Sequence, residues 1–288
     1  MRHHTGVKNK IIDILIYIIL FVVALSSILP IINAVAVSFS DSSKAAAGMV
    51  TFYPLGFNIE SYKQILDDQA FFRALWISVK RVSLSTILVF IIGILTAYPL
   101  SREKKEFKWR GIYVWAIVFT MLFKASLIPK YMAFSSMGLL GSIWVLVLPG
   151  AVSHFLIILI LNFFRSIPKE LDECASLDGA GPWKRLFLIY LPLSKPIIAT
   201  VILFNVVWNW NAFFDGLVFM NRTEQYPLQT YIQQMVVTID PGTTQDVETI
   251  RKRMAVSSRT LNAAKIVVTM FPILVIYPFL QQYFIKGI

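Results

Sequence analysis

Four polar and aromatic side chains lie close together within one apolar stretch of the chain. Asn205, Asn209 and Asn211 are amides, and Trp208 stands among them. Amides exchange hydrogen bonds with hydroxyl groups, and an aromatic face stacks on the C–H surface of a pyranose ring. Asn205, Trp208 and Asn209 are spaced i, i+3 and i+4, which places them on one face of a helix. The pattern therefore predicts a path for a saccharide.

The same four residues have a second interpretation. Amides inside a membrane bundle also hydrogen-bond neighbouring helices, and tryptophans gather where a membrane meets water. Asn205 and Asn209 would then hold helices together, and Trp208 would belong to an interfacial belt. The sequence leaves both interpretations open.

Two titratable residues also lie in apolar stretches. His154 is near the middle of one stretch, and Lys124 is near the end of another. We expect His154 to be hydrogen-bonded in the packing and Lys124 to reach the outer interface with its charged end. If both face the path instead, they favour an anionic oligosaccharide that contains uronate.

The residues of an enzyme active site are not indicated. The sequence contains neither GxxxxGK[ST], which cradles phosphates, nor GxSxG, which presents a nucleophilic serine. One cysteine excludes a disulfide framework, and no Cys and His spacing resembles a metal site. We therefore expect a chain that is not an enzyme and holds no metal or cofactor of its own.

The composition indicates a membrane protein. Of the 288 residues, 57% are hydrophobic and 15% are charged, and the mean hydropathy is +0.67. A soluble domain of this size cannot bury so much apolar surface, so lipid must cover part of it. The net charge of +11 is typical of basic loops at a membrane and does not indicate nucleic acid.

A membrane span needs about 20 apolar residues in a helix. The fold class predicted is therefore all-α, a single transmembrane domain over residues 1–288 with six transmembrane helices. They are expected at about 14–37, 76–100, 111–129, 142–164, 196–220 and 266–285.

The positions of lysine and arginine predict the orientation. The short segments 101–110 and 165–195 are both rich in basic residues. Since short cytoplasmic loops carry an excess of positive charge, both segments and both termini should lie in the cytoplasm. The long segments 38–73 and 221–264 then lie outside, where they can receive a partner.

The segment 165–195 is too polar to enter lipid, and its residues predict two short helices. Pro168 suits a first helical turn, and acidic residues follow it at the positive end of that helix. Gly179 should end the first helix, Pro182 should begin the second, and Pro192 should stop it.

The spacing within this segment resembles a known motif. It matches the EAA loop of permease subunits of binding-protein-dependent ABC importers, written EAA, three residues, G, nine residues, I, any residue, LP. Cys174 stands where the family has alanine, and residues 178–180 add a DGA sequence that carbohydrate permeases often show. The matching residues are Glu173, Cys174, Ala175, Asp178, Gly179, Ala180, Ile189, Leu191 and Pro192.

The resemblance extends along the chain. VAVSFSDSSKAAAG after the first apolar stretch and PILVIYPFLQQYFIKGI at the carboxyl end are similar to the MalG-like and LplC-like permeases. It implies the type I ABC importer permease fold in the inner membrane, with a cytoplasmic coupling helix at about 168–178 that docks on a separate ATPase.

The resemblance also implies partners. These are a second, similar permease subunit in a heterodimer, two ATP-binding subunits that hold ATP and Mg, and an extracellular or lipoprotein solute-binding protein. Oligosaccharide would be the substrate and membrane lipid the surroundings.

Two other functions remain to be compared with this one. A self-contained ion-coupled carrier needs a titratable acid within the membrane, but Asp215 and Asp13 lie near the ends of their apolar stretches. An intramembrane hydrolase needs a nucleophile, and His154 has no serine motif associated with it. Copurification with an ATPase would distinguish the importer from both.

Overall fold

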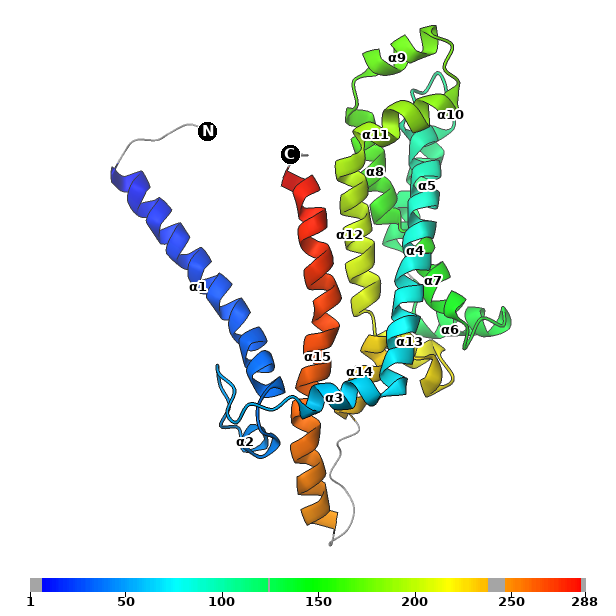
Figure 1. The fold of residues 1–288 in the computed structure, drawn as a ribbon. Helices are drawn as coiled ribbons and strands as arrows, with labels where there is room; N and C mark the ends of the chain where they lie inside the picture. Colours follow the sequence, from blue (N-terminus) through cyan, green and yellow to red (C-terminus); the bar gives the residue numbers. More distant parts are fainter. Residues whose placement is uncertain (1–6, 124, 238–246, 286–288) are drawn as a thin grey trace. The chain divides into compact units, whose positions relative to one another are not determined.

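The regular elements of the described part of the chain are all helices, joined by turns and loops. The computed structural model describes residues 7–123, 125–237 and 247–285, and no strand occurs among them. The elements are α1 (Val7–Ser38), α2 (Ser42–Ala46), α3 (Glu60–Asp67), α4 (Gln69–Ser101), α5 (Arg110–Leu122), α6 (Leu127–Ser136), α7 (Ile143–Ala151), α8 (His154–Ser166), α9 (Lys169–Leu177), α10 (Pro182–Arg185), the π-helix η1 (Leu186–Tyr190), α11 (Leu191–Leu193), α12 (Lys195–Asn211), α13 (Phe214–Phe219), the 3-10 turn η2 (Thr223–Gln225), α14 (Leu228–Val237) and α15 (Val247–Ile285). They are labelled in Figure 1 where there is room.

The chain divides into two compact units. One contains Met1–Gln69 and Met235–Phe271, and the other contains Ala70–Gln234 and Pro272–Ile288. Pro272, which lies inside α15, begins the last segment of the second unit.

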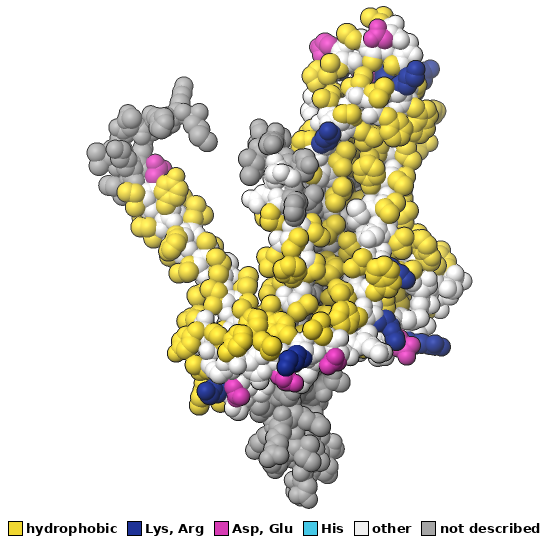
Figure 2. All heavy atoms as spheres, in the orientation of Figure 1, with side chains coloured by type: hydrophobic (Ala, Val, Ile, Leu, Met, Phe, Trp, Pro, Cys, Tyr) yellow, Lys and Arg dark blue, Asp and Glu magenta, His cyan; other side chains and the backbone are white. Residues whose placement is uncertain are grey.

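The first unit contains α1, a helix whose apolar side chains are left uncovered. The most apolar window of Ile12–Ser38 has no buried residue, and Figure 2 shows hydrophobic side chains along the length of this helix. A helix that is hydrophobic on every side is stable only when lipid or another protein covers it. This agrees with a membrane span.

The end of α1 packs into a small core of the first unit. Ala36 and Val37 contact Ala45, Val50 and Ala263 in this cluster. The core joins α1 to the beginning of the segment that was predicted to lie outside the membrane.

A buried ion pair also holds the first unit together. The Lys265 ammonium donates a hydrogen bond to the Asp68 carboxylate at 2.8 Å, and Lys265 is only 2% exposed. One of the basic residues next to the last long loop is therefore neutralised inside the protein.

The second unit is a bundle built on α4, α5, α8 and α12. Helix α8 packs against both α5 and α12, and the buried core includes Val89 and Ile94 of α4 with Leu156 and Ile160 of α8. A Cβ atom at Gly93 would lie 3.0 Å from Cδ1 of Ile160, so the glycine permits this close contact between α4 and α8.

Four helical stretches in the described residues are long and apolar enough to cross a membrane. Two bent pairs of helices raise the number to six if each pair is one span. The four stretches are Ile12–Ser38, Gln69–Ser101, Ile143–Ser166 and Arg259–Pro278.

Three of the predicted spans contain a break in the helix, although α7 and α8, on either side of one break, together form the single stretch Ile143–Ser166. In 111–129, α5 ends at Leu122 and meets α6 at an angle of 113°. Ser126, whose backbone is extended, is the N-cap residue of α6. In 142–164, Val152 and Ser153 have non-helical backbone between α7 and α8.

The third interrupted span is 196–220. Helix α12 ends at Asn211 because Ala212 has extended backbone, and α13 begins two residues later. The Ala212 carbonyl, released from the helix, accepts a hydrogen bond from Nη1 of Arg81 at 3.5 Å. A tertiary contact with α4 thus compensates for the break.

Candidate functional site

Helix α9 lies at one end of the second unit, beside α10 and α11 (Figure 1). Leu177 is 89% exposed, Leu171 is 45% exposed, and Cys174 and Glu173 are exposed as well. The described chain therefore leaves an apolar side of a nine-residue helix uncovered. Such a surface fits a groove on another protein.

The end of α9 is a tight reversal that depends on Gly179. Gly179 has φ +74°, a conformation that costs little only for glycine. The Ala180 amide donates to the Ala175 carbonyl at 2.9 Å and the Gly179 amide donates to the Ser176 carbonyl at 3.1 Å. This is a Schellman motif, with Asp178 as the C-cap.

A buried charge cluster attaches α9 to the bundle. We call Arg102, Asp172 and Arg185 the arginine clamp. Oδ2 of Asp172 accepts from Nη1 of Arg102 and from Nη1 of Arg185, the latter at 3.0 Å. The three side chains are 9%, 13% and 13% exposed, respectively, so solvent screens them little.

Aromatic rings complete the surroundings of the clamp. The Arg102 guanidinium lies 4.3 Å from the ring centre of Tyr98 and 4.6 Å from that of Tyr190. The Tyr98 hydroxyl also donates to the Pro182 carbonyl at 2.9 Å. The clamp therefore connects the end of α4 with α9, α10 and η1.

An exposed ion pair adds a second connection to α9. Lys169 donates to the Glu103 carboxylate. This hydrogen bond lowers the pKa of Glu103 and raises the pKa of Lys169, so both groups stay charged at neutral pH. Because both side chains are more than half exposed, the pair stabilises the structure only slightly.

The chain after Gly179 differs from the sequence prediction at Pro192. Pro182 does begin a helix, but Pro192 lies inside the continuous helical run Pro182–Leu193, which ends one residue after it. The chain bends by 77° between Leu193 and Lys195 instead. Ile189 and Leu191, the remaining EAA residues, pack partly buried against the core of the bundle.

Asn205 and Asn209 form hydrogen bonds between α12 and α4. Oδ1 of Asn205 accepts from Ser85 at 3.2 Å, and its amide nitrogen donates to Thr86 at 3.0 Å. The Asn209 amide donates to Ser85 at 3.0 Å. Of the two interpretations open from the sequence, these contacts are those of residues that join helices.

Trp208 and Asn211 point elsewhere. Trp208 is 64% exposed while Asn205 is 4% exposed, so these two residues of the predicted face differ strongly in burial. A helix residue three positions away is turned by about 60°, which suffices here to move Trp208 out of the contact with α4. Asn211 is exposed at the end of α12.

The structure contains a buried ion pair near these amides that the sequence did not lead us to predict. Nη1 of Arg81 donates to Oδ1 of Asp215 at 3.1 Å, and Nε of Arg81 donates to Asn209 at 3.3 Å. The Arg81 side chain is 4% exposed. The sequence could have indicated this pair, because a cation and an acid within apolar stretches avoid a large desolvation cost by pairing with each other.

The two titratable candidates have different outcomes. His154 is the first residue of α8 and lines an apolar cavity between α4 and α5, away from Asn205 and Asn209. Lys124 lies outside the described residues. The structure therefore does not bring His154 together with the predicted saccharide path.

Comparisons with known proteins agree with this geometry. The family described as "Binding-protein-dependent transport system inner membrane component" matches residues 5–288. The polygalacturonan/rhamnogalacturonan transport system permease protein YtcP of Bacillus subtilis (strain 168) is 34% identical over 280 residues, which cover 97% of each chain. Protein LplC of the same organism is 34% identical over 284 residues, 99% of this chain and 95% of LplC.

A solved structure has the same fold. One chain in the crystal structure of a bacterial ABC transporter involved in the import of the acidic polysaccharide alginate superimposes with a TM-score of 0.87. The two chains are 27% identical, and the match covers 98% of this chain and 100% of the other. The predicted fold class is thereby confirmed.

These matches decide between the functions considered from the sequence. Permeases of this family are not enzymes, and their energy comes from a separate ATPase, so the carrier and hydrolase interpretations are set aside. Asp215, the acid that a carrier would use, is held by Arg81. The chain belongs to the binding-protein-dependent transport inner membrane components, and it is a multi-pass permease of an ABC importer for oligo- or polysaccharides.

Proposed function

We propose that this permease imports oligosaccharides containing uronic acid and that α9 couples the import to ATP hydrolysis in a separate subunit. The observation that supports the coupling role is the combination found at α9. One side of the helix is fixed to the bundle through Asp172, while Leu177 and Cys174 are exposed. A rigid attachment on one side and an apolar surface on the other allow a movement to be transmitted.

The EAA residues have different roles in this proposal. Glu173 pairs with a basic group of the ATPase, and Cys174 and Ala175 form part of the docking helix. Asp178, Gly179 and Ala180 shape the reversal after the helix. The remaining residues seat the segment against the bundle and are Ile189, Leu191 and Pro192.

The complete importer contains several subunits. A second, similar permease forms a heterodimer with this chain, and two ATPase subunits hold ATP and Mg. The basic segments 101–110 and 165–195 and both termini lie in the cytoplasm. The segments 38–73 and 221–264 lie outside and receive the solute-binding protein.

The substrate proposal is supported by the relatives. YtcP is described for polygalacturonan and rhamnogalacturonan, and the matching structure for alginate, an acidic polysaccharide. Of the residues predicted for the path, Trp208 and Asn211 carry the exposed aromatic face and amide that a sugar needs. Asn205 and Asn209 position α12 against α4 behind them.

Substitution of Leu177 tests the docking role. Leu177→Asp places a charge on the exposed side of α9, and we expect the ATPase to be lost from the purified complex and uptake to fall to background. Met137→Asp is the matched control, because Met137 is 68% exposed at the other end of the second unit. A Leu177→Asp complex that retains its ATPase and its uptake would refute the docking role.

Competition during uptake tests the substrate class. Cells that express the whole importer should take up labelled trigalacturonate, and an excess of unlabelled trigalacturonate should suppress the signal. A neutral trisaccharide at the same concentration should leave it unchanged. Equal suppression by the neutral sugar would contradict the acidic substrate without affecting the role of α9.

A further inference from the structure

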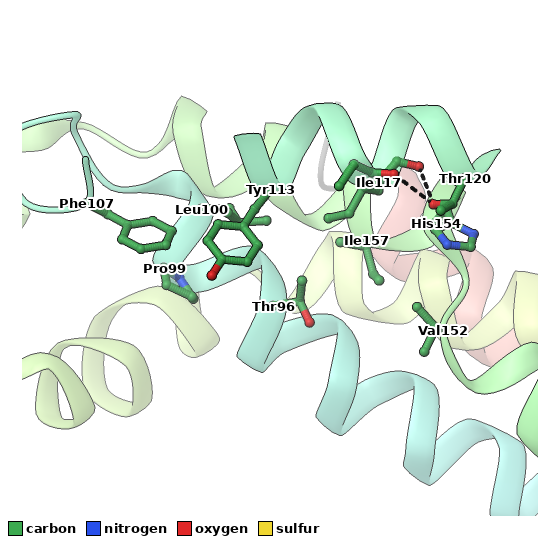
Figure 3. A pocket seen from close by; sticks show the side chains of 11 residues that line it. Thr96, Pro99, Leu100, Phe107, Tyr113, Ile117, Thr120, Val152, His154 and Ile157 are labelled. Carbon is green, nitrogen blue, oxygen red and sulfur yellow. Dashed lines mark hydrogen bonds between the residues drawn. The ribbon is translucent and has the colours of Figure 1, made fainter. Parts of the chain in front are cut away.

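The second unit contains an apolar cavity that the transport mechanism above does not use. It has a volume of about 370 Å³ and lies between α4, α5 and the break before α8. This volume falls in the range of about 300–1,000 Å³ that is usual for sites of small ligands. Figure 3 shows Phe107, Pro99 and Tyr113 at one end and Thr120, Val152 and His154 at the other.

The lining is suited to hydrocarbon rather than to sugar. Leu100, Ile117 and Ile157 contribute apolar side chains. The hydroxyl of Thr120 is already donated to the carbonyls of Ala116 and Ile117, at 2.9 and 3.0 Å. A saccharide would leave its hydroxyls without partners along most of this surface, at a large desolvation cost.

Phe107, at one end of the cavity, belongs to the segment 101–110, which carries a group of cations. Lys104, Lys105 and Lys108 are exposed in the segment 101–110, and none of them has an ion-pair partner among the described residues. Both acids of the segment are already close to other cations, since Glu103 pairs with Lys169 and Glu106 lies 4.0 Å from Arg102. The rim therefore carries uncompensated positive charge.

An aromatic residue marks the depth of this rim. Trp109 is 65% exposed and lies directly before the first turn of α5. Exposed tryptophans at the ends of membrane helices favour the headgroup region. The lysines thus lie at the level of lipid phosphates, and the cavity extends from there along α5 into the hydrocarbon region.

We propose that this cavity is a binding site for one anionic phospholipid. An acyl chain occupies the space between α4 and α5, and the phosphate is held by Lys104, Lys105 and Lys108. Positive charge at the headgroup level beside an apolar cavity between membrane helices is the combination that recognises such lipids. The orientation proposed above decides only which leaflet supplies the lipid, the cytoplasmic one.

Lipid retention by the whole importer tests this site. The detergent-purified complex is mixed with equal amounts of phosphatidylglycerol and phosphatidylcholine that have the same acyl chains, and bound lipid is counted by native mass spectrometry. We expect one phosphatidylglycerol to be retained. If both lipids are retained equally, the proposed headgroup recognition is wrong.

Two variants separate the headgroup from the chain. Replacing Lys104, Lys105 and Lys108 by glutamine should weaken phosphatidylglycerol binding about 100-fold, from about 1 kcal/mol for each lysine. Ala116→Trp should fill the cavity and abolish retention. Leu122→Trp is its control, since Leu122 is 73% exposed on the same helix and does not line the cavity.

The competing occupant of the cavity is the second permease subunit. A photo-cross-linking amino acid in place of Ala116 should capture lipid in membranes that contain the whole importer. Capture of the other permease, or unchanged lipid retention by Ala116→Trp, would overturn the proposal. These readouts need neither substrate nor ATP, so failure of the proposed substrate leaves them unaffected.

Discussion

Asp172 is the single acid that the arginine clamp contains. Its carboxylate accepts from two guanidinium groups, so one positive charge in the cluster is not compensated by a carboxylate in hydrogen-bond contact. The faces of Tyr98 and Tyr190, which carry partial negative charge, lie against Arg102. The attachment of α9 therefore depends strongly on one ionised side chain.

Asp172→Asn should loosen α9 from the bundle. Removing the charge leaves the nearly buried Arg185 without its carboxylate partner and Arg102 with only the longer contact to Glu106, and we expect a loss of about 3 kcal/mol in stability. Measured in the purified importer, the melting temperature should fall, and less substrate should enter for each ATP hydrolysed.

The control for this change is Glu106→Gln. Glu106 lies 4.0 Å from the same arginine but is 47% exposed, so its removal should cost less than about 1 kcal/mol. Equal effects of the two substitutions would contradict the role given to Asp172.

At the scale of elements, helix α9 and its ends could be predicted from the sequence. Gly179 follows the C-cap as its backbone preference requires, and Pro168, predicted in the first turn, lies one residue earlier at the N-cap. The breaks in the membrane helices could not be predicted, because they depend on contacts with other helices. The end of α12 is stabilised by Arg81, which is 131 residues away from Ala212 in the chain.

The same reason limits what the sequence revealed of the candidate site. The spacing of Asn205, Trp208 and Asn209 gives their approximate direction around a helix but not which neighbour each will meet. Ser85 and Arg81 of α4 decide the outcome, since they hydrogen-bond the two amides. Local motifs thus predicted α9, whereas the packing of α12 required the tertiary structure.

The packing of α13 gives a prediction at this scale. A Cβ atom at Gly216 would overlap the Thr230 side chain, which itself donates to the Phe213 carbonyl at 2.8 Å. Gly216→Ala should therefore lower the melting temperature of the importer. Gly150→Ala is the matched control, because Gly150 is also helical and no atom lies within 4 Å of the added Cβ. That control should be neutral or slightly stabilising.

At the scale of the whole molecule, the chain has the surfaces of one part of a larger assembly. Lipid accounts for the exposed apolar residues of the membrane helices, but it does not account for Leu177 on a polar helix outside them. Trp208 and Asn211 likewise remain exposed on the described chain. The ATPase and the second permease that we propose as partners suit these two regions.

Cys174 allows the arrangement of the assembly to be measured. It is the only cysteine in the sequence and is exposed on α9. A membrane-impermeant maleimide should label it in inverted vesicles and not in intact cells, and bound ATPase should slow the labelling. A cysteine at position 137 in a Cys174→Ser background should show the opposite sidedness. Labelling of Cys174 from outside would reverse the proposed orientation.

The uncovered surface of α1 has a consequence for biosynthesis. Since the most apolar window of this helix makes no buried contact with the chain, its entry into the bilayer needs no later segment. A nascent chain can therefore be anchored while the ribosome is still making α4. The first span to be anchored usually sets the orientation in which the following spans are inserted into the membrane. Errors at this early step would be inherited by every helix that follows.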